Sequence, residues 1–486
     1  MLHAFDFDTG KELWAFIPPS LLPKLRQMKS DKANISNVIY GVDGAPIVKD
    51  IYYDDSWKTI VLTGLGEGGK SYFALDITDT ENPKHLFTFK NNFIPKVGDK
   101  DQDGNKLYHE GEIVHWSADG SETVLPYEDT INDIELTSPE HNYSRLGDAT
   151  SEPRILRIGY NGKDKWVAVF GAGENQVAKD DSGNAMFGSA VYVIDLEDEG
   201  KVLKNISLTD KNNDIVNAVP APITMIRADD TSLATYKGGM IYVTDKESKL
   251  WKIDLTGDNT SFDSTQLFDS EATYDNQRFS YYEVGASVID HQTIGNKLWL
   301  YYGTGNKKGL ALATGDIQNF IYGIRDSHFQ NFQSISYTPT VADCTDGSKC
   351  PPSSTDKGWA IDISKTNNNK NYRKVTAKPR IINQKVKFLF YDPDLNNPCN
   401  LGTGSQRTYN YKCGNETGAI KKGVKGLMTH SVTYKGKEYI TVSGTISDNA
   451  SDLDKNVTKA TDNIIIVTPN QDSRGNIEID SWRERY

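Results

Sequence analysis

Apolar and polar residues alternate in short stretches along this chain, the pattern of β-strands that bury one face. One phrase recurs: an apolar stretch, a glycine-rich turn, and a second stretch that often ends at aspartate. Its clearest copies span residues 2–14, 57–76, 166–195, 241–254 and 298–324, and residues 358–362 and 439–444 fit it in part. Helical periodicity is scarce, and residues 19–28 form the best candidate for an amphipathic helix.

Short strands separated by tight turns favour antiparallel sheets stacked around an axis, because each sheet alone would expose an apolar face. We therefore predict an all-β fold, a β-propeller in which residues 1–486 form one domain. Polar loop insertions are expected at about residues 91–145 and 339–357. Strands at 463–468 and 477–482 are expected to complete the first sheet and close the ring. A pair of β-sandwiches is the competing architecture.

Composition narrows the class of protein further. The 486 residues carry a net charge of −12, which argues against nucleic-acid binding, since that requires a basic face. No apolar stretch approaches the ~18 residues of a membrane-spanning helix. The N-terminus has neither the basic nor the apolar region of a signal peptide. It enters a strand directly, so we expect the chain to be part of a longer protein.

The four cysteines form two local pairs in turn-rich loops. Neither pair has the spacing of a zinc, redox or haem motif. An even number of cysteines in such loops favours two disulfides and an oxidising compartment, while four reduced thiols in a cytosolic protein are the alternative. The residues concerned are Cys344, Cys350, Cys399 and Cys413.

The sharpest chemical signal is an acidic loop at residues 99–110, which matches D-x-[DN]-x-[DN]-G-x5-E at every specified position. Carboxylates at this spacing repel one another without a cation, and Ca²⁺ prefers such oxygen ligands. Gly104 permits the sharp turn. The flanks look like strands, so we predict an isolated structural calcium site rather than a paired EF-hand. The predicted ligands are Asp99, Asp101, Asp103, Asn105, Leu107 and Glu110.

No set of acid, base and nucleophile is evident, which favours a protein that is not an enzyme. Residues 64–71 fit the phosphate-binding loop pattern, but a strand rather than a helix follows, which favours a turn between strands. Two further groups could bind an ion, although solvated loops are favoured. They are Asp180, Asp181 and Asn184, and Asp210, Asn212 and Asp214.

Beyond these patterns, the chain resembles the C-terminal domain of the PilC/PilY family, which comprises type IV pilus biogenesis factors and pilus-tip adhesins. The resemblance extends over almost the whole chain and is most specific in the first 76 residues. The segments that carry it are 1–25, 42–46, 57–62, 66–69, 73–76, 166–171, 250–254, 358–362 and 481–483.

This resemblance implies a modified seven-bladed propeller that is secreted and associated with the outer membrane or pilus of a Gram-negative bacterium. It also implies roles in pilus assembly against retraction, in adherence and in twitching motility, all modulated by calcium. The expected partners are pilins or minor pilins and a host-cell receptor. The family's calcium loop precedes the strand at 241–244, but residues 227–236 lack its pattern, which leaves 99–110 as the predicted site. The family's N-terminal half is absent from this chain.

Two alternatives from other classes remain. Residues 8–14 resemble the turn repeat of quinoprotein dehydrogenases, which are also calcium-using propellers. That turn is clear only once here, whereas those enzymes repeat it around the ring. A glycan-binding propeller is the second alternative, and it is compatible with a role in adhesion.

Overall fold

We describe the protein from a computed structural model. For some residues the structure describes the backbone but not the side chains. These are the described residues within 93–100, 106–110, 128–136, 139, 289, 297, 342–343 and 366–371. The described residues are 1–29, 38–100, 106–130, 133–136, 139–174, 187–208, 217–226, 238–257, 260–270, 279–289, 297–312, 317–329, 342–343, 358–364, 366–367, 370–382, 384–397, 399–420 and 422–468.

The chain divides into two compact units. One contains Met1–Arg227, Thr235–Lys246 and Ile253–Ser264. The other contains Ala228–Ala234, Glu247–Lys252 and Thr265–Tyr486. Antiparallel strands dominate both units, so the predicted all-β fold is confirmed.

The first unit begins with a hairpin of β1 (Leu2–Phe5) and β2 (Glu12–Phe16). A 3₁₀ turn, η1 (Pro19–Leu21), then continues into α1 (Leu22–Met28). Proline suits the start of a helix because its missing N–H would be unpaired there in any case. The helix predicted at residues 19–28 is therefore confirmed. No helix in the described part of the chain is long and apolar enough to cross a membrane.

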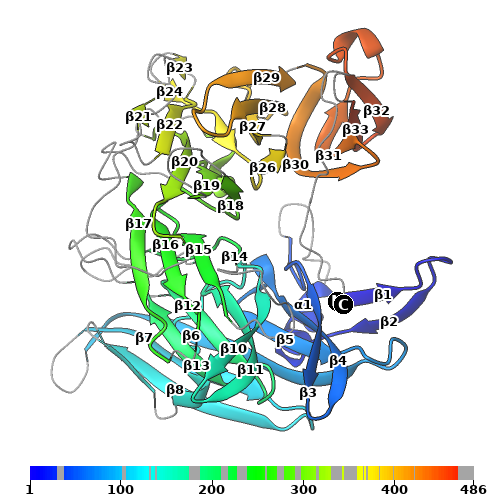
Figure 1. Ribbon diagram of the computed structural model, residues 1–486. Helices are drawn as coiled ribbons and strands as arrows, with labels where there is room; N and C mark the ends of the chain where they lie inside the picture. The colour runs from blue at the N-terminus through cyan, green and yellow to red at the C-terminus, as the bar shows by residue number, and fades with distance from the viewer. Residues whose placement is uncertain are drawn as a thin grey trace. The chain divides into compact units, whose positions relative to one another are not determined.

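The largest sheet of the first unit has seven strands in chain order (Figure 1). The strand after the glycine turn is β5, as predicted, and η2 (Gly66–Gly68) forms that turn. The strands are β3 (Ile47–Tyr53), β4 (Ser56–Gly64), β5 (Ser71–Asp76), β6 (Lys84–Lys100), β7 (Lys106–Trp116), β8 (Glu122–Thr130) and β9 (Asp133–Leu136).

Strands β6 to β9 occupy most of the segment 91–145, which the sequence analysis treated as a polar loop. That expectation is wrong. Ile113 of β7 and Tyr127 of β8 are buried in the core, while other residues of these strands face solvent. A sheet with one solvated face needs few apolar residues, so its strands read as polar.

A four-stranded sheet follows, with an aromatic core against β5 and β6. The rings of Phe89 and Tyr143 stack at 3.6 Å between centroids, and those of Tyr72 and Phe170 lie 4.3 Å apart. The Tyr72 hydroxyl donates to the carbonyl of Ser151 at 2.7 Å, which satisfies its one polar group in the core. The strands are β10 (Arg154–Tyr160), β11 (Lys163–Gly171), β12 (Ala190–Asp195) and β13 (Val202–Ser207).

Two more sheets contain the fourth and fifth copies of the strand–turn–strand phrase. The first consists of β14 (Thr224–Ile226), β15 (Met240–Thr244), β16 (Leu250–Asp254) and β17 (Ser264–Phe268). The second consists of β18 (Gly285–Ile289), β19 (Lys297–Gly303), β20 (Phe320–Asp326), β22 (Gly358–Asp362) and the short parallel β21 (Ala342–Asp343). A two-stranded pair, β23 (Thr366–Asn367) and β24 (Lys370–Asn371), stands alone.

The last sheet lies in the second unit and has nine strands. A single residue pair, Thr403 with Lys425, joins its two halves at β28 and β30. The strands are β25 (Lys374–Val375), β26 (Arg380–Ile382), β27 (Lys385–Asp392), β28 (Thr403–Asn410), β29 (Glu416–Ile420), β30 (Val424–Tyr434), β31 (Lys437–Ile446), β32 (Val457–Thr461) and β33 (Ile464–Val467).

The predicted ring closure through residues 463–468 is wrong. Strand β33 pairs with β31 on one side and β32 on the other, so both of its edges are already used. Within the described ranges β1 and β2 pair only with each other, and no sheet closes on itself. Residues 477–482, and most of the insertion at 339–357, lie outside the described residues. The seven blades stay a prediction.

Candidate functional site

The predicted calcium loop coincides with the connection between β6 and β7. Asp99, near the end of β6, pairs with Leu107 of β7, and Glu110 pairs with Ile94. Glu110 is therefore separated from Asp99 along the hairpin, whereas in an EF-hand loop the last ligand returns to the first. The other predicted ligands, Asp101, Asp103 and Asn105, lie outside the described residues. The ligand set stays a prediction. A variant of Glu110 must test whether this residue binds the ion together with Asp99.

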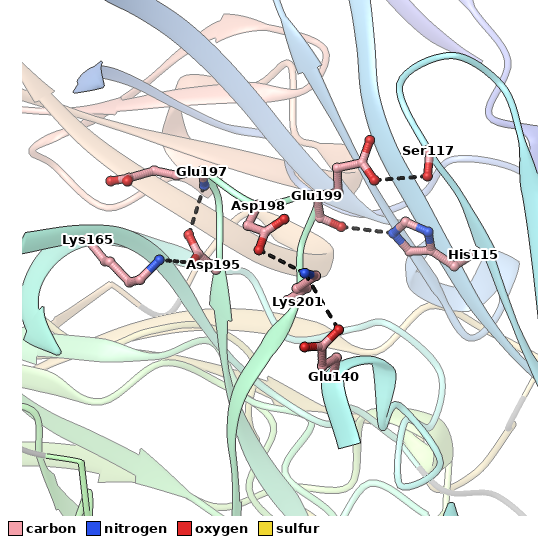
Figure 2. A network of polar contacts seen from close by, with 9 residues as sticks. All are labelled: His115, Ser117, Glu140, Lys165, Asp195, Glu197, Asp198, Glu199 and Lys201. Carbon is pink, nitrogen blue, oxygen red and sulfur yellow. Dashed lines mark hydrogen bonds and ion pairs between the residues drawn. The ribbon is translucent and has the colours of Figure 1, made fainter. Parts of the chain in front are cut away.

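The turn between β12 and β13 forms a polar clasp against the sheet that carries this hairpin (Figure 2). We use the name clasp for residues 195–201 and the groups they bind. Some of its polar contacts join turn residues to neighbouring elements, and others lie within the turn. The turn reads Asp195-Leu196-Glu197-Asp198-Glu199-Gly200-Lys201.

One side of the clasp holds the β7–β8 hairpin. The Glu199 carboxylate accepts hydrogen bonds from the Ser117 hydroxyl at 2.9 Å and from the backbone N–H of Ala118 at 3.2 Å. The Glu199 backbone carbonyl lies 2.8 Å from Nε2 of His115, so this nitrogen carries the proton. Next to it, the Tyr143 hydroxyl donates to the Gly200 carbonyl. Four contacts therefore fasten residues 115–118 and 143 to one turn.

The other side of the clasp is ionic. Lys165 of β11 pairs with Asp195, whose carboxylate also accepts from the Glu197 backbone N–H at 2.9 Å. Lys201 bridges Asp198 at 3.0 Å and Glu140 of η3 (Pro139–His141) at 3.5 Å (Figure 2). These contacts hold the acidic turn in one conformation, since most of its carboxylates have a fixed donor.

Two imidazoles lie at the centre of the clasp. The rings of His115 and His141 are 4.4 Å apart between centroids. Burial lowers the pKa of His115, and burial, together with the repulsion that a protonated His115 would exert, lowers the pKa of His141 to about 4. His85, on β6, also has its pKa lowered by burial. The histidines are therefore neutral at neutral pH and act as packing and hydrogen-bonding groups.

These groups can position a hairpin but do not form a catalytic set. The carboxylates of the clasp are engaged by lysines or backbone N–H groups, and the Ser117 hydroxyl donates to Glu199 rather than to a histidine (Figure 2). No cluster of three or more metal-ligating side chains occurs in the described part of the chain. The sequence analysis missed the clasp. Its only signal was the run of acidic residues at 195–199 ahead of Lys201.

The cysteine prediction is partly wrong. Neither Cys399 nor Cys413 forms a disulfide, and the Cys413 thiol lies within hydrogen-bonding distance of Asn415. Each cysteine sits in its own turn: the Cys399 N–H donates to the side chain of Asn397, and the Cys413 N–H donates to that of Asn410. Hydrogen bonds within each turn, rather than a disulfide, therefore stabilise the loops that contain Cys399 and Cys413.

The remaining sequence candidates are not described. Cys344 and Cys350 lie outside the described residues, as do Asp180, Asp181, Asn184, Asp210, Asn212 and Asp214.

Comparison with known proteins shows which proteins this chain is similar to. A family model described as the PilY1 beta-propeller domain matches residues 1–110. The type IV pilus biogenesis factor PilY1 of Pseudomonas aeruginosa (strain UCBPP-PA14) is 26% identical over 265 residues, which cover 54% of this chain and 17% of PilY1. A PilY1 homolog of Xylella fastidiosa (strain Temecula1) is 43% identical over 88 residues, 18% of this chain and 7% of the homolog.

A solved structure supports the fold. The crystal structure of the Pseudomonas aeruginosa PilY1 C-terminal domain superposes with a TM-score of 0.54 at 18% identity, covering 91% of this chain and 89% of that one. The described strands and this superposition define an all-β protein whose fold is like that of the PilY1 C-terminal domain. The chain is therefore similar to the C-terminal domain of PilY1 proteins, and the resemblance noted from the sequence is confirmed. It spans only about a sixth of the length of the curated relatives it matches.

Proposed function

We propose that this chain is the C-terminal module of a type IV pilus biogenesis factor and that it works without catalysis. The observation that carries the proposal is the family match over residues 1–110, reinforced by the 43% identity to the Xylella fastidiosa homolog over 88 residues. In this proposal the module supports pilus assembly against retraction, adherence and twitching motility. It acts outside the cell, at the outer membrane or on the pilus, and contacts pilins or minor pilins and a host-cell receptor.

Deletion of the coding region in the source bacterium tests this role. We expect few surface pili and a small twitching zone, with both restored by the full-length wild-type gene. Removing pilus retraction in the same strain should restore the pili but not the motility, because assembly would then no longer be opposed. Normal pili and normal twitching in the deletion strain would contradict the proposal.

We further propose that the β6–β7 hairpin binds one Ca²⁺. The residues that would hold the ion are Asp99, Asp101, Asp103, Asn105, Leu107 and Glu110. The chain supplies carboxylate and carbonyl oxygens, which suit a hard cation. Support comes from the match to the loop pattern at every specified position and from the hairpin that carries it. When bound, the ion would neutralise carboxylates that otherwise repel one another.

Calorimetric titration of calcium into the purified chain tests this site. We expect one site of micromolar to sub-millimolar affinity, which is lost in Asp101→Ala. Asp119→Ala is the matched control, because Asp119 is an exposed acid in the neighbouring β7–β8 turn and lies outside the pattern. Glu110→Ala distinguishes two ligand sets: a full loss places Glu110 on the ion, and unchanged affinity limits the site to the hairpin connection. Absence of heat, or equal binding by Asp101→Ala, would overturn the proposal.

A further inference from the structure

The β3–β4 hairpin displays two aromatic rings next to its turn. Tyr52 and Trp57 are direct cross-strand neighbours, and their rings lie 5.5 Å apart at an interplanar angle of 63°. Tyr52 is 49% exposed and Trp57 is 54% exposed. About half of each side chain therefore faces solvent, although burying an aromatic side chain is among the most favourable steps of folding.

The backbone that carries these rings is held firmly. Asp54 and Asp55 form the turn with φ angles of 52° and 54°, a left-handed conformation that costs free energy for residues other than glycine. The carbonyl of Tyr52 accepts a hydrogen bond at 3.0 Å from the indole N–H of Trp166 on β11. The ring pair is thus presented in a defined position, which reduces the entropy cost of binding.

A polar pair lies next to the rings on the same face. The Thr59 hydroxyl donates to the Asp50 carboxylate at 2.7 Å, and these residues are the cross-strand pair two positions along from Tyr52 and Trp57. Two positions correspond to ~7 Å along a strand. The hairpin therefore presents aromatic surface beside a carboxylate and a hydroxyl.

The lysines of this hairpin lie on its opposite face. Strand residues alternate between faces, which places Lys49 and Lys58 away from Tyr52 and Trp57. The Lys58 ammonium lies 3.8 Å from the centroid of the Tyr53 ring, which confirms its direction. Among the residues of β3 and β4, the face that carries the exposed rings thus has a negative group and no positive one, which disfavours an anionic ligand.

We propose that this face of the β3–β4 hairpin binds the ring of a neutral carbohydrate. The C–H groups on one side of a sugar ring carry partial positive charge, and they match the negative face of an aromatic ring. Sugar hydroxyls both donate and accept hydrogen bonds, which suits the adjacent Asp50 and Thr59. A cationic side chain only donates, so it uses this polar pair less completely. The inference goes beyond the pilus role and is independent of the calcium site.

The test uses the purified chain and four probes: neutral hexasaccharides of glucose and of N-acetylglucosamine, a sulfated hexasaccharide, and an arginine-rich peptide. Binding is followed by tryptophan fluorescence and by saturation-transfer NMR. Trp57→Ala, Tyr52→Ala and the conservative Trp57→Tyr are compared with Tyr434→Ala. Tyr434 is a matched control because it is 59% exposed and lies on another hairpin, at the end of β30.

We expect a neutral hexasaccharide to bind the wild-type chain and Tyr434→Ala alike. Both alanine variants of the ring pair should lose at least ~10-fold in affinity, and Trp57→Tyr should lose less, since a ring remains. Circular dichroism verifies that each variant is folded. The proposal is overturned if no neutral sugar binds the wild type, if only the sulfated sugar or the peptide binds, or if binding survives in the folded Trp57→Ala variant.

Discussion

The ammonium group of Lys252 and the carboxylate of Asp326 form an ion pair at 2.7 Å, and neither side chain has any exposed surface. Lys252 lies on β16 and Asp326 is the last residue of β20. Removing charges from water costs several kcal/mol for each ion, and pairing offsets this cost only while both partners are present. The attraction between the two groups therefore offsets the cost of burying each charge in the core.

Loss of one partner is expected to destabilise the chain strongly. Lys252→Met leaves the Asp326 carboxylate buried without its cation and should lower the free energy of unfolding by about 3–5 kcal/mol. Lys252→Met combined with Asp326→Leu should cost less than the single change. Urea unfolding followed by circular dichroism measures both. Lys459→Met, which removes a cation paired with exposed Asp448 and Asp462, is the control and should leave the free energy of unfolding almost unchanged, because water screens these pairs. Equal losses in the two lysine variants would contradict this prediction.

Gly323 of β20 is required because the indole of Trp359 lies directly over it. The two residues are paired across β20 and β22, and a Cβ at position 323 would lie 2.4 Å from Cε2 of Trp359. The ring cannot move freely, since it is fully buried and its N–H donates to the Tyr411 carbonyl at 3.0 Å. We expect Gly323→Ala to lower the unfolding free energy by about 2–3 kcal/mol.

Gly418→Ala is the matched control for that variant. Gly418 also lies in a strand of the second unit, β29, but a Cβ there meets no atom within 4 Å. The substitution should leave the unfolding free energy within ~1 kcal/mol of wild type. A Gly323→Ala variant as stable as Gly418→Ala would show that the indole can shift aside.

The histidines of the clasp predict a loss of stability in acid. An imidazole of the unfolded chain has a pKa of ~6.5, whereas that of His141 in the folded chain is lowered to about 4. Between these values the unfolded chain binds more protons, so the stabilisation is complete above pH ~6.5 and is lost as the pH falls toward 4. Because the ring is only partly buried, we expect a loss of about 1–2 kcal/mol.

Thermal unfolding between pH 4 and 8 measures this loss. His141→Phe removes the titrating group, so its melting temperature should fall less steeply between pH ~6.5 and 4 than that of the wild type. His430→Gln, at an exposed position on β30 in the second unit, should retain the wild-type profile. Parallel profiles for His141→Phe and the wild type would show that the folded chain accepts the proton without cost.

Glu199 should control the local opening of the β7–β8 hairpin. Glu199→Ala removes the acceptor of the Ser117 hydroxyl and of the Ala118 N–H. The contacts are near the surface, so the unfolding free energy should change by less than ~1 kcal/mol. The Ala118 amide should nevertheless exchange with solvent ~10-fold faster. Hydrogen exchange by NMR measures this, with Asp164→Ala, a surface partner of Arg157, as control. Unchanged exchange at Ala118 would contradict the role given to the clasp.

The local elements were predictable from the sequence because they depend on neighbouring residues. Residues 166–170 and 191–195 are nearly continuous apolar runs of strand length, and β11 and β12 pair in register there. The closing strand was not predictable in this way. Residues 464–467 are apolar at every position and fit any open sheet edge equally well. Only tertiary packing selects β31 and β32 as their partners.

The candidate sites show the same limit. The calcium pattern is contiguous in sequence and could be found, but its ligand geometry depends on the register of β6 and β7, which the pattern does not contain. The clasp joins His115, His141 and Glu199, which are far apart in the chain. The exposed ring pair of the β3–β4 hairpin could not be predicted from the sequence either, because Tyr52 and Trp57 fit the pattern of ordinary strand residues. Their exposure follows from which face of the hairpin the core covers.

The pairing of strands in chain order has a consequence for the route by which the protein folds. The sheet of β10 to β13 is built from one continuous segment, Arg154 to Ser207, and each strand pairs with the next along the chain. Pairing between consecutive strands closes loops that are short compared with the whole chain, which favours rapid formation. Such a sheet can form during synthesis, once its own segment has left the ribosome and before the C-terminal sheets exist.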